Sequence, residues 1–193
     1  MRRPLTISTG LALAVGILAT AVRAEEFRSG PQVGDLVGAF TVVKAAGAAE
    51  DGVAVGDELC YRCRMGNRPM VMVFAHTPDA KLAGLVTQLD KLVADNKEKK
   101  VGSFVSLLGD KTDELRSEAK TFVEKNKIEN IAFVVPEENK TGPSDYNLND
   151  KVDVTVLIYR EGKVAANHAL AAGGLNDEEI KRIMADTGKI LND

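Results

Sequence analysis

Residues 70–75 decide the fold of this chain: they read Met-Val-Met-Val-Phe-Ala, an unbroken apolar run of strand length. A run without polar alternation is typical of a strand that is covered on both faces, as in a parallel sheet. The next apolar positions, from Leu82 to Val93, recur every three or four residues and predict an amphipathic helix. Residues 77–79, Thr-Pro-Asp, supply a cap and a helix-start proline. The stretch therefore predicts a buried strand followed by a covering helix.

The same alternation of patterns continues to the end of the chain. Strands are expected at 101–108, 131–135, 152–159 and 163–166, and helices around 115–123 and 180–191. Residues 160–162, Arg-Glu-Gly, separate the last two strands and predict a hairpin, and Asn176 or Asp177 is expected to cap the last helix. The order β-α-β-α-β-β-α predicts an α/β fold with a central mixed sheet and helices on both faces.

This order resembles the thioredoxin fold, and two stretches carry the likeness. Residues 156–164, Val-Leu-Ile-Tyr-Arg-Glu-Gly-Lys-Val, resemble the final hairpin of thioredoxins. Residues 30–35, Gly-Pro-Gln-Val-Gly-Asp, with Phe40 soon after, resemble the opening of redoxin and peroxiredoxin-like proteins. The resemblance implies a three-layer α/β/α sandwich over residues 69–193 with an N-terminal extension at 25–68, the whole of 25–193 being one compact unit.

Cys60 and Cys63 are the only cysteines, and they have the CxxC spacing of redox enzymes. Together with residues 66–69, Gly-Asn-Arg-Pro, the pair resembles a group of exported bacterial thioredoxin-like proteins. The resemblance implies a thiol–disulfide oxidoreductase that acts on the thiols or disulfides of a protein partner, with Cys60 attacking and Cys63 resolving. Three arginines nearby, Arg62, Arg64 and Arg68, would stabilise a thiolate.

The position of the pair departs from the thioredoxin pattern. In thioredoxin-like enzymes the CxxC follows the first core strand, but here His76 and Thr77 occupy that place and the cysteines precede the strand. A cis-proline normally faces the redox pair, and the corresponding residue here is Val154. His76, Thr77 and Val154 are therefore predicted to border a possible pocket at the carboxyl end of the sheet. The alternative for His76 is a helix-capping loop.

A second function stays open on the sequence alone. A non-catalytic binding or scaffold domain would retain the fold and use Cys60–Cys63 as a structural disulfide. A ring of four residues restricts little chain, so such a bond would contribute only about 2 kcal/mol. The weak constraint favours redox chemistry, whereas the displaced position favours the structural alternative.

No cofactor or metal is predicted. Zinc requires four ligands, and the only candidates are the two cysteines with His76 and His168, which lack finger-like spacing. Covalent haem attachment requires a histidine directly after the second cysteine, where this chain has Arg64.

Residues 1–24 predict a cleaved signal peptide and hence an exported protein, periplasmic or extracellular, with no stable membrane insertion after cleavage. A retained anchor is the alternative, although the apolar run is short for a bilayer. Residues 1–24 contain three arginines and no acidic residue, so cleavage lowers the formal net charge from −3 to −6. This acidic balance argues against nucleic-acid binding. The sequence does not indicate an oligomeric state.

Overall fold

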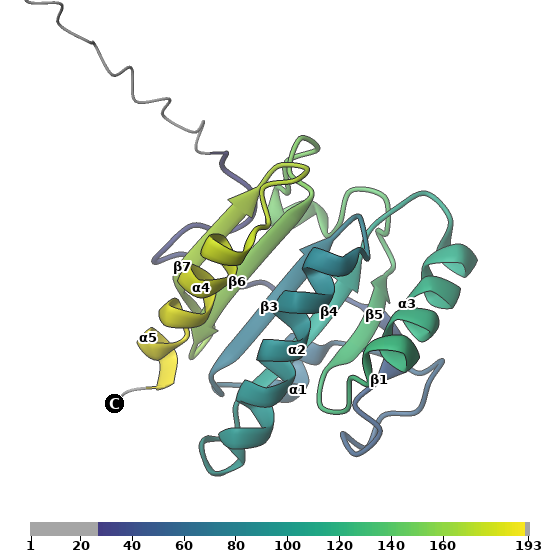
Figure 1. The fold of residues 1–193 in the computed structure, drawn as a ribbon, viewed down its shortest axis with the longest axis horizontal. Helices are drawn as coiled ribbons and strands as arrows, with labels where there is room; N and C mark the ends of the chain where they lie inside the picture. Colours follow the sequence, from purple (N-terminus) through teal and green to yellow (C-terminus); the bar gives the residue numbers. More distant parts are fainter. Residues whose placement is uncertain (1–26, 192–193) are drawn as a thin grey trace, which may run out of the picture.

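The computed structural model describes residues 27–191, which form one seven-stranded mixed sheet with helices packed on it (Figure 1). The strands are β1 (Val42–Gly47), β2 (Glu58–Leu59), β3 (Met70–Ala75), β4 (Gly102–Leu107), β5 (Ala132–Pro136), β6 (Val154–Arg160) and β7 (Lys163–Leu170). The helices are α1 (Tyr61–Met65), α2 (Ala80–Asp95), α3 (Thr112–Asn126), α4 (Asp177–Asp186) and α5 (Gly188–Leu191), with short 3₁₀ turns η1 (Lys97–Lys99) and η2 (Ser144–Tyr146). The predicted order from β3 onward is confirmed, except that the last helix is divided at Thr187.

The strands lie in the order β2-β1-β5-β4-β3-β6-β7. Strands β3, β4 and β5 are parallel, whereas β6 and β7 form the predicted antiparallel hairpin beside β3. Met70, the first residue of β3, pairs with Gly102 on one side and Tyr159 on the other, and Ala75, the last, pairs with Leu107 and Val154. The first and last residues of β3 thus mark the two ends of the central sheet.

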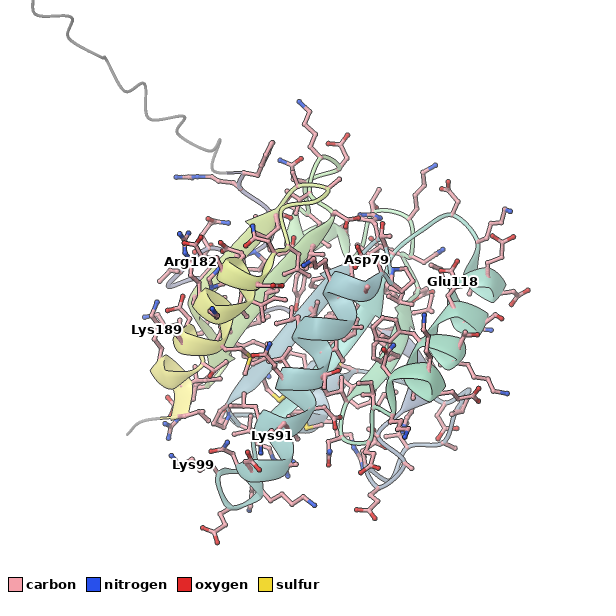
Figure 2. The ribbon with its side chains drawn as sticks, in the orientation of Figure 1. Asp79, Lys91, Lys99, Glu118, Arg182 and Lys189 are labelled. Atoms are coloured by element: carbon pink, nitrogen blue, oxygen red, sulfur yellow. A yellow bond between two sulfur atoms is a disulfide. The ribbon has the colours of Figure 1, made fainter. Side chains whose placement is uncertain are left out.

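Each face of the sheet has its own core, because successive strand residues point to opposite faces. Val71, Val73 and Ala75 pack in one cluster with α2, α3, α4 and α5, which lie over the same face in Figure 1. The charged side chains labelled on three of these helices, Lys91, Glu118 and Arg182, point away from the sheet (Figure 2).

Met70, Met72 and Phe74 pack on the other face against a thinner layer. Tyr61 of α1, Tyr146 of η2 and the segment around Val37 form this layer. The α/β fold class is therefore confirmed, with one helical layer much thicker than the other.

The N-terminal extension differs from the sequence prediction in two ways. Residues 39–43 predict a short strand and the small residues 45–56 a loop, but β1 spans Val42–Gly47, because Ala45 and Ala46 are buried in the core beneath the helices. Helix α1, which contains Cys63, was not predicted. The predicted signal peptide lies outside the described residues, and within residues 27–191 no helix is long and apolar enough to cross a bilayer.

Candidate functional site

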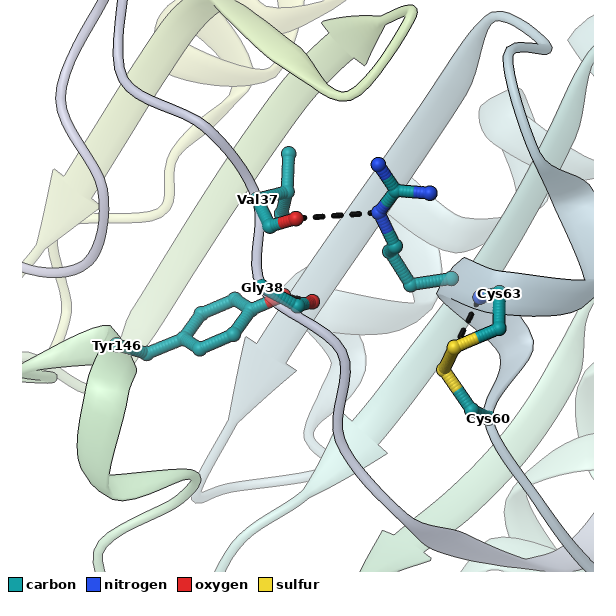
Figure 3. Close-up of a disulfide and its surroundings, with 6 residues drawn as sticks. Val37, Gly38, Cys60, Cys63 and Tyr146 are labelled. Carbon is teal, nitrogen blue, oxygen red and sulfur yellow. Dashed lines mark hydrogen bonds between the residues drawn. A yellow bond between two sulfur atoms is a disulfide. The ribbon is translucent and has the colours of Figure 1, made fainter.

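Cys60 and Cys63 form a disulfide at the start of α1 (Figure 3). Cys60 is the N-cap of the helix, and its Sγ accepts the backbone N–H of Cys63 at 3.0 Å. Cys63 is exposed and Cys60 is half-buried. The disulfide therefore lies at the surface, and once it is reduced the same N–H would stabilise a Cys60 thiolate.

Helix α1 lies at the end of the sheet where β3 begins. Met65 lies against Gly102 at the start of β4, and Arg62 lies against Gly162 in the β6–β7 turn. His76 directly follows Ala75, the last residue of β3, which lies about 16 Å along the strand from Met70. The structure therefore places the CxxC pair and the predicted pocket at opposite ends of the sheet.

The predicted pocket residues do come together at that other end. Val154 pairs with Ala75 and is buried, and the backbone N–H of His76 donates to the Asp153 carbonyl at 3.0 Å. Thr77 Oγ1 donates to the Asp153 carboxylate at 2.9 Å. All peptide bonds within residues 27–191 are trans. The three residues are therefore neighbours, and Thr77 holds the loop that leads into α2.

Two of the three arginines near the pair are hydrogen-bonded to neighbouring backbone. Arg62 Nε donates to the Val37 carbonyl at 3.1 Å (Figure 3), and Arg64 donates to the Asp51 carbonyl at 2.7 Å. Arg68 lines the cavity beside α1. Arg62 and Arg64 therefore fasten α1 to the segments around it, a role that the sequence did not indicate.

A buried polar network beneath α1 was also missed by the sequence analysis. Tyr61, between the two cysteines, is 2% exposed and stacks on Phe104 with ring centroids 5.4 Å apart. Its hydroxyl donates to the Asp51 carboxylate, which also accepts from Lys44 Nζ at 2.7 Å and from the Val53 N–H at 2.8 Å. The available signal was Lys44 itself, a charged residue between the β-type run 39–43 and the small residues that follow it.

The second histidine is also a structural residue. His168 lies on β7, with Nδ1 3.2 Å from Glu179 Oε1 and Nε2 3.1 Å from Asp186 Oδ2. It therefore links β7 to α4, on the opposite face from α1. Within residues 27–191 no group of three or more His, Cys, Asp or Glu side chains is arranged to hold a metal ion.

No family model matches the sequence, and no curated protein matches it. Solved structures do match over most of their length. A proposed protein disulfide isomerase from Bacteroides thetaiotaomicron matches with a TM-score of 0.62 and 11% identity, covering 86% of this chain and 96% of its own. A proposed thiol:disulfide interchange protein DsbE from Chlorobium tepidum matches with a TM-score of 0.56 and 17% identity, over 81% and 99% of the two chains. This chain has a thioredoxin-like fold.

A further thioredoxin-like match is a secreted Mycobacterium tuberculosis disulfide oxidoreductase homologous to E. coli DsbE. It has a TM-score of 0.52 and 16% identity, and the match covers 76% of this chain and 95% of that one. At these identities the likeness establishes the fold, and the chemistry must be argued from the residues.

Tyr61 gives the thioredoxin-like domain a testable response to alkaline pH. Burial and the hydrogen bond to Asp51 raise the pKa of Tyr61 above its ordinary value of 10.0, and burial likewise raises the pKa of Tyr146 and Tyr159. Their stabilising contribution is complete below pH 10 and is lost as the pH rises further, because only the unfolded chain ionises there. We expect Tyr61→Phe to reduce this loss by up to about 1.4 kcal/mol per pH unit in urea denaturation. An unchanged slope would contradict the assignment.

Proposed function

We propose that this protein carries out thiol–disulfide exchange with a protein partner through Cys60 and Cys63. The observation that supports it is the surface position of the disulfide, with Cys63 exposed and Cys60 half-buried. A partner can reach a bond in this place, and the N–H that caps Cys60 favours its thiolate. Cysteines kept for packing alone are usually buried and inert.

The exchange balances without any further reagent. In the reduced protein the Cys60 thiolate attacks one sulfur of a partner disulfide, and the other partner sulfur leaves as a thiolate. Cys63 then loses its proton and attacks Cys60 Sγ, which forms the Cys60–Cys63 bond and releases the second partner thiolate. The partner gains two electrons and the cysteine pair loses two. The reverse sequence oxidises a partner dithiol, starting from the disulfide state seen here.

The reduction potential of the pair tests this function. We expect a value above about −300 mV, since structural disulfides lie below that limit. The measurement equilibrates the purified protein with glutathione buffers and quantifies the reduced fraction. Reduction of insulin by the same preparation gives a second readout. A potential below the limit together with no insulin reduction would refute thiol exchange.

The position of α1 favours a second candidate function, a non-catalytic binding or scaffold domain with a structural disulfide. The pair lies at the opposite end of the sheet from His76 and Val154, where thioredoxin-like enzymes have their redox site. On this alternative, the double variant Cys60→Ser, Cys63→Ser keeps its partner and loses about 2 kcal/mol of stability. Loss of partner binding in the double variant would contradict the scaffold alternative.

We also propose that the protein is exported, which would place Cys60 and Cys63 in an oxidising compartment. Residues 1–24 have the composition of a signal peptide. N-terminal sequencing of the mature protein tests this, and we expect the chain to begin near Glu25. A mature protein that retains residues 1–24 would refute cleavage.

A further inference from the structure

A cavity of about 250 Å³ lies beside α1, at the end of the sheet where β3 and β4 begin. Tyr61 and Met65 of α1 form one wall, and the turn that follows α2 contributes Lys97 and Lys100. Strand β4 contributes Gly102, which has no side chain, and Ser103. The cavity is on the inner side of the helix that carries Cys63, whereas the disulfide is on the surface.

Positive charge converges on this cavity in a chain that is acidic as a whole, with a formal net charge of −3. Arg68, Lys97 and Lys100 all line it. Neither lysine has an ion-pair partner among the described residues, unlike Lys91, which pairs with Asp95 at 2.7 Å. Like charges that line one cavity repel one another, and an anion bound among them offsets that repulsion.

The one acidic lining residue does not neutralise these cations. Asp51 is occupied by Lys44, whose Nζ is 2.7 Å away, and by the hydroxyl of Tyr61. Lys44 is itself 1% exposed. The negative charge of Asp51 is therefore offset by the buried positive charge of Lys44 and does not offset the charges of the lining cations. The three cations at the cavity therefore remain in excess.

The lining also includes a buried polar group without a partner. Ser103 is 5% exposed, and its Oγ makes no hydrogen bond with any described residue. A buried hydroxyl in this state costs free energy unless a ligand or water satisfies it. Together the excess cations and this hydroxyl favour a ligand with several oxygen acceptors.

We propose that this cavity binds a small polyvalent oxyanion, a phosphate or a dicarboxylate, between Arg68, Lys97 and Lys100. The guanidinium of Arg68 can bind two oxygens of either group side by side, and the lysines supply point charges. The size of the cavity restricts the ligand to a small molecule or a terminal group. The site is separate from thiol exchange, because neither cysteine lines it.

Titration calorimetry with inorganic phosphate and with succinate, at constant ionic strength set by chloride, tests the site. We expect saturable millimolar or tighter binding of at least one of the two, and the stronger ligand identifies the class. Lys97→Gln with Lys100→Gln should raise the dissociation constant about tenfold. Backbone amide shifts of Gly102 and Asn130, which line the cavity, should move on titration and locate the ligand.

Lys99→Gln is the matched control, because Lys99 lies on the same turn, at the end of α2 (Figure 2), and does not line the cavity. It should leave the dissociation constant unchanged. The proposal is overturned if neither anion binds beyond the effect of chloride, or if the double variant and the control bind equally. Circular dichroism should show that both variants are folded, because these lysines are exposed.

Discussion

The Cys63→Ser variant is expected to accumulate a covalent adduct with a disulfide-containing protein substrate, linked through Cys60. Exchange proceeds through a mixed disulfide, and the second thiol is needed to resolve it. Without Cys63 the adduct persists, and multiple-turnover insulin reduction falls to the background rate. Non-reducing electrophoresis and intact mass measure the adduct, and addition of a small thiol should dissolve it. The expected trap on Cys60 rests on the N–H of Cys63, which lies 3.0 Å from Cys60 Sγ and favours that thiolate.

Cys60→Ser is the matched control, since it also leaves one thiol in the same helix. It should form little adduct, because Cys60 and not Cys63 is the sulfur that accepts the N–H. If Cys60→Ser accumulates an adduct through Cys63, and Cys63→Ser accumulates none through Cys60, the order of roles is reversed. No adduct with either variant would favour the scaffold alternative, in which the bond contributes only about 2 kcal/mol to stability.

The parts of the fold that the sequence predicts are those with a local periodic signal. Residues 70–75 show a continuous apolar run and are fully buried in β3, and the spacing from Leu82 to Val93 becomes the inner face of α2. Each of these patterns lies within a single strand or helix, so it can be recognised without knowledge of the tertiary structure. Helix α1 has only five residues, too few for a repeat to be visible, and its form depends on the capping at Cys60.

The site was less accessible to sequence reasoning because its contacts are long-range. His76, Thr77 and Val154 do lie at one end of the sheet, and that they border a pocket stays a prediction. The network of Asp51 with Lys44 and Tyr61 joins residues that no motif connects. Residues 97–100, Lys-Glu-Lys-Lys, predict a solvated turn, and all four are exposed in the structure. The sequence does not show that two of them also line a cavity beside α1. Which charges face a cavity is decided by packing, and composition does not record it.

The Asp51→Ala variant is expected to lose about 3 kcal/mol in free energy of unfolding, because it leaves Lys44 buried without its counter-charge. Lys44 is 1% exposed, and its remaining partners would be the carbonyls of Ala48 and Val53 at 2.9 and 2.8 Å. An ammonium group with two neutral acceptors is poorly compensated away from water. Urea denaturation at neutral pH measures the change. Lys44→Met removes the buried positive charge. The double variant Lys44→Met, Asp51→Ala should therefore lose less free energy of unfolding than the sum of the losses in the two single variants.

Asp57→Ala is the matched control, an exposed aspartate of the same loop whose carboxylate accepts the Ala54 N–H at 3.0 Å. It should cost about 1 kcal/mol or less. Equal losses in the two variants would show that the pair with Lys44 contributes little. The two aspartates should also differ in their effect on α1, since only Asp51 binds Tyr61, the residue between the cysteines. Amide hydrogen exchange in α1 should therefore accelerate in Asp51→Ala and stay unchanged in Asp57→Ala, because the helix that carries Cys63 is fastened to the sheet through that tyrosine.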